Sequence, residues 1–323
     1  MKIVFTSCFD AESDPVQAVW ERVVALQPDV LLLLGDSIYM DFGITGKRAL
    51  GEPRGYSLEA FAANMHGLYA RQWGVASFQR LVHSGLRVGM TWDDHDFAWN
   101  DSRGAGTQKK YAVSPERKRI SRGLHLQFRQ VLETRQLGSA YPACPAIAQL
   151  LAEPDAGIQS LFDVGGVRFV MLDGRTFRPD PREPDWLEPI STMHGSEQMN
   201  WLIDNLNNFA GIKIVGAGSV MSGGKEAWDR YLDYEMLLAR APKGVVVLTG
   251  DIHKNKRPRN HRPGRVPLYE ITASGAARPG PVHVFPRLAG ASGNFGVLEI
   301  NGGEVEVTLY DRHGAGRPER LAF

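Results

Sequence analysis

The sequence predicts an α/β domain in which two β-sheets lie face to face and helices flank them. Three observations favour this fold class. In the first part of the chain, apolar strands alternate with segments of helical periodicity, a pattern typical of βαβ units. Two strongly apolar strands, residues 30–34 (VLLLL) and 245–249 (VVVLT), each lead into a Gly-Asp pair, as expected for strands buried on both faces. Near the end, residues 305–310 alternate as a half-exposed antiparallel strand does.

The first part of the chain predicts a βαβ unit followed by two helices and a third strand. Residues 2–6 favour a strand, and apolar residues at helical spacing predict a helix over residues 16–26. The next strand ends at Asp36, and the crossover between these two strands should be right-handed. Helices are expected over residues 58–72 and 75–83, and a strand over residues 87–91. Residues 103–135 are polar and basic, so we expect a helical insertion, with a helix over about residues 115–132, that forms a lid rather than core.

A hairpin opens the second part, where strands over residues 159–163 and 167–172 are joined by Gly165-Gly166. Residues 178–189 contain four Pro residues and are expected to form a loop. Ser196 is a candidate N-cap for a helix over residues 196–209. The pattern predicts one domain over residues 1–323, and the further strands are expected over residues 212–216, 245–249, 269–273, 295–300 and 305–310.

Composition is that of an ordinary soluble globular protein, with 43% apolar and 23% charged residues. The 37 basic and 36 acidic residues nearly cancel, so no overall field favours nucleic acid or an anionic membrane. No apolar run approaches the roughly 20 residues that span a membrane, and the N-terminus lacks the apolar region of a signal peptide. We therefore expect a cytoplasmic protein, although a mature chain without its signal would look the same. Only Cys8 and Cys144 occur, far apart, so we expect no structural disulfide.

Acidic and imidazole side chains follow three of the expected strands. Asp36 lies in GDSIY, Asp251 and His253 lie in GDIH, and residues 92–101 are WDDHDFAWND. The carboxyl ends of strands are where open α/β sheets place their chemistry. Carboxylates and neutral His are ligands for iron, zinc or manganese, and two ions about 3.5–4 Å apart can clamp a phosphoryl group. The pattern therefore predicts a metal-dependent hydrolase.

Each of these side chains also has a structural alternative. Asp36 is the best candidate for a carboxylate shared by two ions, but an Asp after a strand can also cap a turn. Asp251 and His253 are two residues apart, so an extended segment points both side chains the same way. A lone His at a strand end can equally be a hydrogen-bonded structural residue. The apolar strand before Gly250 favours a ligand here.

The acidic segment offers more candidates than one site needs. Asp93, Asp94 and Asp96 cannot all stay ionised close together without a cation. Either a metal neutralises them or two of the three face solvent, which we expect for Asp93 or Asp96. His95 either binds metal or donates to a substrate oxygen.

The motifs resemble those of the alkaline phosphatase D (PhoD-like) family, within the calcineurin-like metallophosphoesterase superfamily. In the family's order they are Ser7-Cys8, GDSIY, TWDDHDF with WND, LDGR at residues 172–175, GSEQMNWL at residues 195–202, and GDIH. The resemblance implies a four-layer αββα sandwich with two mixed sheets. It also implies a binuclear metal centre that hydrolyses phosphomonoesters or phosphodiesters.

The resemblance assigns metal ligands to individual residues. Cys8 matches a thiolate ligand, Tyr39 a phenolate ligand and Asp36 the carboxylate that bridges the ions, while His253 matches the second His of the superfamily's Gly-His-x-His motif. Thiolate and phenolate together imply Fe³⁺, with Ca²⁺ or another divalent ion (Zn²⁺, Mn²⁺ or Mg²⁺) as the second metal. The implied ligands of that second ion are Asp94, Asn100 and Asp251. The alternative for Cys8 is a buried, inert thiol.

Two residues are implied to act on the substrate. His95 matches the His that contacts phosphate, and Arg175 matches an Arg that grips phosphate through its planar donor pattern. A salt bridge to Asp173 is the alternative for Arg175. Cys144 has no counterpart among the motifs and is expected to be structural.

Residues 253–265 contain six Lys or Arg residues directly after the GDIH motif. This segment is either a solvated loop or an electropositive rim that attracts anionic substrates. No interleaved aromatic residues indicate a dedicated nucleic-acid surface. Because the first expected strand begins at residue 2, we expect neither the export signal nor the extra N-terminal β domain of better-known family members, and the thirteen residues after the last expected strand should leave little room for a C-terminal helix. Both departures argue against an exported, phosphate-scavenging role and the iron and calcium pairing.

The leading hypothesis is a phosphomonoesterase or phosphodiesterase in which a metal-bound hydroxide attacks phosphorus in line at a binuclear centre. Its partner would be a small phosphate ester, with no membrane involved and nucleic acid only as a substrate. The alternative is a catalytically weak metal-binding protein of the same fold that binds a phosphorylated or nucleic-acid partner.

Overall fold

A computed structural model describes residues 1–42, 52–134, 138–182, 189–278 and 293–323. The first of its two sheets consists of β1 (Lys2–Thr6), β2 (Val30–Leu34), β3 (Arg87–Thr91), β10 (Phe295–Asn301), β11 (Glu304–Asp311), β12 (Gly314–Ala315) and β13 (Glu319–Leu321). The strand order is β12-β11-β10-β1-β2-β3, with β13 paired to β11. β1, β2 and β3 are parallel, whereas β10 is antiparallel to β1, so the sheet is mixed.

The second sheet consists of β4 (Ser160–Val164), β5 (Val167–Met171), β6 (Ile212–Ala217), β7 (Val245–Thr249), β8 (Lys256–Asn260) and β9 (Leu268–Thr272). Its order is β4-β5-β6-β7-β9-β8. The four inner strands are parallel, and the two edge strands pair antiparallel to their neighbours. Since this sheet is also mixed, the carboxyl ends of parallel strands from both sheets can supply a common site.

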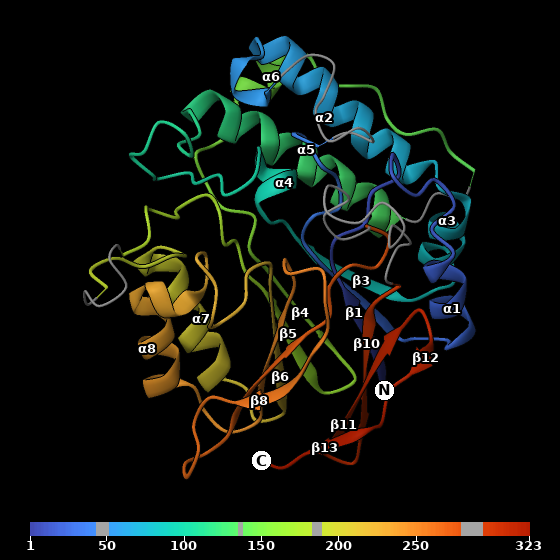
Figure 1. Cartoon of the computed structure of the whole chain (residues 1–323), viewed down its shortest axis with the longest axis vertical. Helices are drawn as coiled ribbons and strands as arrows, with labels where there is room; N and C mark the ends of the chain where they lie inside the picture. Colours follow the sequence, from blue (N-terminus) through green and yellow to red (C-terminus); the bar gives the residue numbers. More distant parts are fainter. Residues whose placement is uncertain (43–51, 135–137, 183–188, 279–292) are drawn as a thin grey trace.

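The helices are α1 (Val19–Ala25), α2 (Leu58–Trp73), α3 (Ala76–Val82), α4 (Asp94–Phe97), α5 (Pro115–Thr134), α6 (Ile147–Leu151), α7 (Ser196–Asn207) and α8 (Leu232–Arg240), with short 3₁₀ turns η1 (Pro53–Gly55) and η2 (Trp228–Arg230). In Figure 1 the sheets lie between α7 and α8 on one side and the remaining helices on the other. No helix in the described part of the chain has both the length and the apolar character of a membrane span.

Alternation along the strands creates the four layers, because successive side chains of a strand point to opposite faces. In β1, Val4 packs with the helices of the first sheet, whereas Ile3 and Phe5 pack against the second sheet. In the second sheet, Ile214 faces the other sheet and Val215 faces the cluster that contains α7. The four-layer αββα sandwich with two mixed sheets is therefore confirmed.

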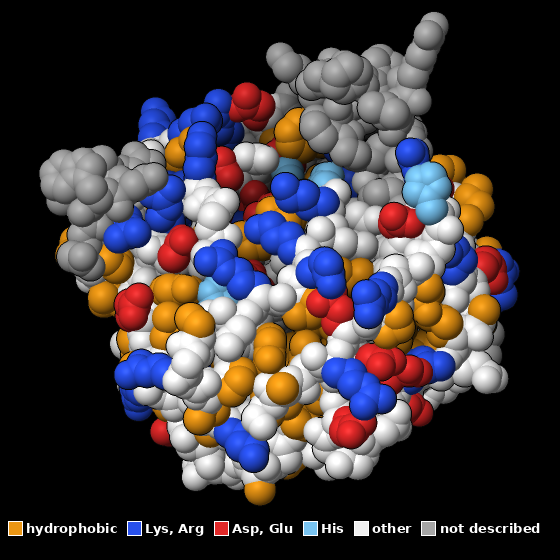
Figure 2. All heavy atoms as spheres, turned by 60° about the horizontal axis from the view of Figure 1, so that its bottom comes forward, with side chains coloured by type: hydrophobic (Ala, Val, Ile, Leu, Met, Phe, Trp, Pro, Cys, Tyr) orange, Lys and Arg blue, Asp and Glu red, His pale blue; other side chains and the backbone are white. Residues whose placement is uncertain are grey.

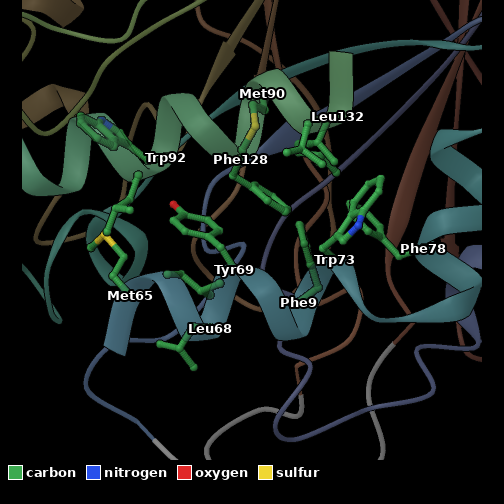
Figure 3. Packing of buried hydrophobic residues seen from close by; sticks show 14 of the residues in the cluster. Phe9, Met65, Leu68, Tyr69, Trp73, Phe78, Met90, Trp92, Phe128 and Leu132 are labelled. Atoms are coloured by element: carbon green, nitrogen blue, oxygen red, sulfur yellow. The ribbon is translucent and has the colours of Figure 1, made fainter. Parts of the chain in front are cut away.

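The helical layer over the first sheet is packed largely through aromatic rings. Tyr69 and Trp73 of α2 meet Phe128 of α5, and the Tyr69 and Phe128 rings stack with centroids 4.7 Å apart (Figure 3). Leu132 is also fully buried. The inner face of α5 thus belongs to the core, and the expectation that residues 103–135 form only a lid is wrong for this helix; residues 135–137 lie outside the described residues.

Several element boundaries differ from the sequence-based expectation. Gly195 stands before α7 with a positive φ of 78°, so Ser196 is the first helical residue and not the cap. The first helix begins at Val19 rather than at Val16. Residues after the last expected strand form β12 and β13, which pair with β11. Of the expected loop over residues 178–189, residues 183–188 lie outside the described part.

Candidate metal centre

The carboxyl ends of β1, β2, β3 and β7 meet, and a glycine permits their close approach. Gly35, directly after β2, has φ of +91°, and a Cβ at this position would lie 2.7 Å from both Cβ and N of Asp93. Any other residue would be strained and would push the loop after β3 away. The Gly-Asp pair therefore brings the GDSIY turn against the acidic segment.

The backbone is strained at four of the expected ligands. Among the described residues, Cys8, Asp36, Asp251 and His253 have positive φ values of 60°, 52°, 71° and 52°. Residues other than glycine rarely adopt this conformation, and it costs of order 1–3 kcal/mol unless the surroundings impose it. Such strain concentrates at functional sites, where it aims side chains that a relaxed turn would direct elsewhere.

Four of the expected ligands, Cys8, Asp36, Tyr39 and His253, form what we call the thiol half of the site. Cys8 Sγ lies 3.4 Å from Asp36 Oδ2, and the Tyr39 hydroxyl lies 3.3 Å from the same oxygen. The hydroxyl is also 3.1 Å from His253 Nε2. Donor atoms of Cys8, Asp36 and His253 all lie within 4.8 Å of one another, so one ion could contact all three.

In the thiol half, burial outweighs the cations that lie nearby. Burial raises the pKa values of Asp36, Cys8 and Tyr39 well above their usual ranges, and neighbouring acidic groups raise them further, although His95 lowers the pKa of Asp36 and Arg278 lowers that of Tyr39. Asp36 Oδ1 is buried without a hydrogen-bond partner among the described residues. A buried acid in this position either keeps its proton or gains a cation. The donor set of thiol, phenol, carboxylate and imidazole fits a metal ion.

Asp93, Asp94 and Asp251 form the opposite side, which we call the carboxylate half. Arg175 Nε lies 2.6 Å from Asp93 Oδ1, and Arg175 Nη2 lies 3.8 Å from Asp94 Oδ1. Burial would raise the pKa of Asp94, but the charges of Arg175 and His95 lower it to about 2. Burial and the charges of Asp93 and Asp94 raise the pKa of Asp251 to about 8. Arg175 thus helps to keep the pKa of Asp94 low, whereas burial and the neighbouring acids dominate at Asp251.

The two halves meet at Asp36. Its carboxylate also belongs to a second group with Asp94 and His95, whose donor atoms lie within 4.8 Å of one another. Asp36 thus contributes a donor atom to both groups, and its role as a shared ligand stays a prediction. Asn100 is exposed, and its role as a ligand also stays a prediction.

Asp93, Asp94 and Asp96 are all buried, contrary to the expectation that Asp93 or Asp96 faces solvent. Asp93 and Asp96 are 1% and 0% exposed. Arg175 neutralises Asp93, while Asp96 accepts hydrogen bonds from the backbone N–H groups of Ser37 (3.1 Å) and Asp93 (2.6 Å). Burial outweighs these bonds and raises the pKa of Asp96 to about 7. Asp96 therefore joins α4 to the GDSIY turn.

Arg175 lies behind the metal ligands and is only 1% exposed. Its guanidinium contacts Asp93, Glu226 at 3.3 Å and the Ser219 hydroxyl at 3.3 Å. The alternative of a salt bridge to Asp173 is wrong, because Asp173 instead accepts a bond from the Arg175 backbone N–H. In this geometry Arg175 holds Asp93 and Asp94 in place, and its contact with a substrate stays a prediction.

Sequence reasoning missed Asp41, which orients His95. Asp41 Oδ1 lies 2.6 Å from His95 Nδ1, and Asp41 Oδ2 accepts a 2.8 Å bond from the backbone N–H of Asn100. Burial would lower the pKa of His95, but Asp41, Asp94 and Asp36 raise it well above its usual value. These carboxylates therefore favour the protonated form of His95. The position of Asp41, two residues after Tyr39, was the available signal.

Arg278 was also missed. Its guanidinium carbon lies 4.0 Å from the centre of the Tyr39 ring, a cation–π contact, and it pairs with Asp10. No sequence motif distinguishes this Arg from any other. It places a positive charge beside the thiol half.

The basic segment over residues 253–265 is not simply a loop, because it contains the edge strand β8. Its charges are partly engaged: Arg257 pairs with Glu319, Arg259 donates to the Ser222 hydroxyl and Arg262 to the Ala241 carbonyl. Figure 2 nevertheless shows Lys and Arg side chains around a hollow in which His side chains are visible. Cys144 is exposed and free.

Comparisons with known proteins show the family and the fold. A family model described as PhoD-like phosphatase matches residues 3–262. A dimetal phosphatase from Danio rerio is structurally similar, with a TM-score of 0.55 at 14% identity over 99% of this chain and 98% of that one. YfkN from Bacillus subtilis, a calcineurin-like phosphoesterase, matches with a TM-score of 0.37 at 11% identity over 100% and 90% of the two chains. No curated protein is similar enough in sequence to count as a relative.

Proposed function

Because the chain belongs to the PhoD-like phosphatase family, we propose that it hydrolyses phosphoric esters at a binuclear metal centre formed by the thiol and carboxylate halves. One observation supports this most directly. Asp36 contributes a donor atom to both ligand groups, which is the position of a carboxylate shared by two ions. Both phosphomonoesters and phosphodiesters are candidate substrates.

The residues divide between two ions. Cys8, Tyr39 and His253 would hold the first, Asp94 and Asp251 the second, with Asp36 shared. The thiol and phenol of the first group favour Fe³⁺ there, beside Ca²⁺ or another divalent ion. Bound in these positions, the two ions would polarise the phosphoryl group and supply a nucleophile at neutral pH.

The chain's own cations supply the remaining electrostatics. His95, held by Asp41 at 2.6 Å, would donate a hydrogen bond to a phosphoryl oxygen, or a proton to the departing oxygen. Arg175 would act indirectly, because it holds the carboxylates of Asp93 and Asp94 in position. Arg278 keeps a positive charge over the Tyr39 ring.

The proposal is tested by metal analysis, a visible spectrum and rates toward p-nitrophenyl phosphate and bis(p-nitrophenyl) phosphate. We expect two metal equivalents, and an absorption band from tyrosinate bound to iron if Fe³⁺ occupies the thiol half. Asp36→Asn should lower kcat/KM by about 10³-fold or more, because it removes the shared ligand. Its fold should persist, since the substitution relieves crowding among buried acids.

Asp204→Asn on α7 is the matched control, because Asp204 is exposed and far in sequence from every ligand. Undiminished activity in Asp36→Asn would contradict the proposal. Zinc alone, with no visible band, would contradict iron but not the hydrolase. A protein that binds two metal equivalents yet hydrolyses neither ester would favour the catalytically weak, phosphate-binding alternative.

A further inference from the structure

A second cavity, about 380 Å³ in volume, is lined by basic side chains from two parts of the first helical layer. We call it the basic pocket, and Arg54, Lys109, Lys110 and Arg117 line it together with the indole of Trp99. No acidic residue of the described chain lines it. None of its residues belongs to the thiol or carboxylate half. Unlike the two halves of the metal centre, the basic pocket combines basic side chains with no acidic one among its described lining residues.

The backbone holds this pocket in shape. The Trp99 indole N–H donates a 3.1 Å bond to the Lys110 carbonyl, which ties the two lysines to the segment after α4. On the other wall, the Arg117 guanidinium donates to the carbonyls of Arg54 (3.2 Å) and Tyr56 (2.7 Å). These bonds fix the positions of the cations but leave their charges in place, since carbonyl groups are neutral.

Little opposing charge is available to the pocket. Among the ion pairs of the described residues, Arg54 pairs with Glu52, whereas Lys109, Lys110 and Arg117 have no acidic partner. Lys109 and Lys110 are exposed, so they attract anions from solution. Several converging cations in one concave site are what a phosphate dianion requires.

The basic pocket adjoins the metal centre through one short segment. Trp99 precedes Asn100, whose backbone N–H donates to the same Asp41 carboxylate that holds His95. Trp99 lies four positions after His95, so their Cα atoms are at most about 14 Å apart.

We propose that the basic pocket binds a second phosphate group of the substrate, so that the preferred substrates are small phosphoric esters that carry two phosphates. This inference rests on the proposed function, and it deepens it by naming the substrate class. The metal centre takes the phosphate that reacts. Lys109, Lys110 and Arg117 hold the other, and the Trp99 ring offers an apolar wall to the organic group between them.

The test compares two nucleotides that differ only in one phosphate, thymidine 5′-phosphate and thymidine 3′,5′-bisphosphate, as competitors of p-nitrophenyl phosphate hydrolysis by the metal-loaded protein. We expect the bisphosphate to inhibit at about tenfold lower concentration, since each cation contributes a modest ion-pair energy. In the double variant Lys109→Gln/Lys110→Gln this preference should fall to about threefold or less. Hydrolysis of p-nitrophenyl phosphate itself should stay unchanged, because it has no second phosphate.

Arg265→Gln/Arg317→Gln is the matched control, because both residues are exposed and outside the pocket while the same charge is removed. It should keep the tenfold preference. Equal inhibition by the two nucleotides, or a preference that survives in the lysine variant, would overturn the inference. Calorimetry with the same pair needs no turnover, so the pocket is tested even if p-nitrophenyl esters are not hydrolysed and the proposed function fails.

Discussion

The thiol half and the carboxylate half of the metal centre hold their buried acids in different ways. In the thiol half, burial raises the pKa values of Asp36, Cys8 and Tyr39, and Asp36 Oδ1 has no partner among the described residues. In the carboxylate half, Arg175 lies 2.6 Å from Asp93 and helps to lower the pKa of Asp94 to about 2. In the thiol half, burial outweighs the nearby charges of His95 and Arg278, whereas in the carboxylate half the contact with Arg175 keeps the pKa of Asp94 low.

This difference predicts an order of metal affinity. An ion in the thiol half would neutralise acids whose pKa values burial keeps raised, so it gains a strong electrostatic attraction. An ion in the carboxylate half adds charge beside an existing guanidinium, which repels it. We therefore expect the first ion to bind tightly and the second to exchange more readily. The three predictions below test this contrast.

We expect the largest effect, a loss of stability in the metal-free protein, from Arg175→Met. Removing the guanidinium leaves Asp93 and Glu226 buried without this partner, and breaking a buried ion pair costs about 3–5 kcal/mol. Urea unfolding of the metal-free protein measures the loss in free energy of unfolding. A divalent ion should stabilise the variant more than the wild type, because Asp93 and Asp94 then lack their resident cation.

Arg168→Met gives the matched control for this prediction. Arg168 pairs with Asp163 at 2.8 Å, and the Asp163 side chain is 41% exposed. Exposed pairs contribute at most about 1 kcal/mol, so this variant should unfold nearly as the wild type does. A similar loss in both variants would show that Arg175 has no special role beside the acids.

Tyr39→Phe should produce the next largest effect, and only in the thiol half. The phenol lies 3.3 Å from Asp36 and 3.1 Å from His253, so its loss removes one donor of the first ion. We expect the affinity for that ion to fall by at least about tenfold, with little change at the second site. Titration with chelators of known strength measures both affinities.

Tyr69→Phe removes a buried hydroxyl from the helical core instead, where Tyr69 meets His125 at 3.3 Å. Neither ion should be affected by it. If Tyr39→Phe weakened both ions equally, the division into two halves would be wrong.

Much of the fold follows from local pattern, because apolar strands and amphipathic helices show their burial in their own residues. The strands at residues 2–6, 87–91 and 245–249 were predicted with their observed bounds. Strand β8 was not, since a polar edge strand with Arg257 and Arg259 exposed has the composition of a loop. The helix α4 has only four residues, too few to show a period.

The candidate site, like the fold, has a part that the sequence predicted and a part that it did not. Residues at strand ends identified the candidate ligands, and the structure brings Cys8, Asp36 and His253 together. The role of Arg175 could not be predicted, because an Arg after a strand has the same sequence whether it faces substrate or a buried carboxylate. The packing of β3 against the loop after β5 decides which of these two roles Arg175 takes. It brings Arg175 Nε to 2.6 Å from Asp93 Oδ1.

The smallest expected effect is the pH dependence of the stability of the metal-free protein. It depends on Asp251, the one acid of the carboxylate half that does not pair with Arg175. Burial and the charges of Asp93 and Asp94 raise the pKa of Asp251 to about 8, against about 4 in the unfolded chain. Between these values the folded metal-free protein holds a proton that the unfolded chain releases, so its stability should fall as pH rises from about 4 to 8. Metal ions replace such protons, and they should therefore stabilise the protein more at pH 8 than at pH 5.

Calorimetric Tm values measured across this range, with and without metal, provide the check. In Asp251→Asn the slope for the metal-free protein should shrink by at most one proton, whereas Asp204→Asn should leave it unchanged; an unaltered slope in Asp251→Asn would assign the titration to the other buried acids with raised pKa values, Asp36, Asp93 and Asp96.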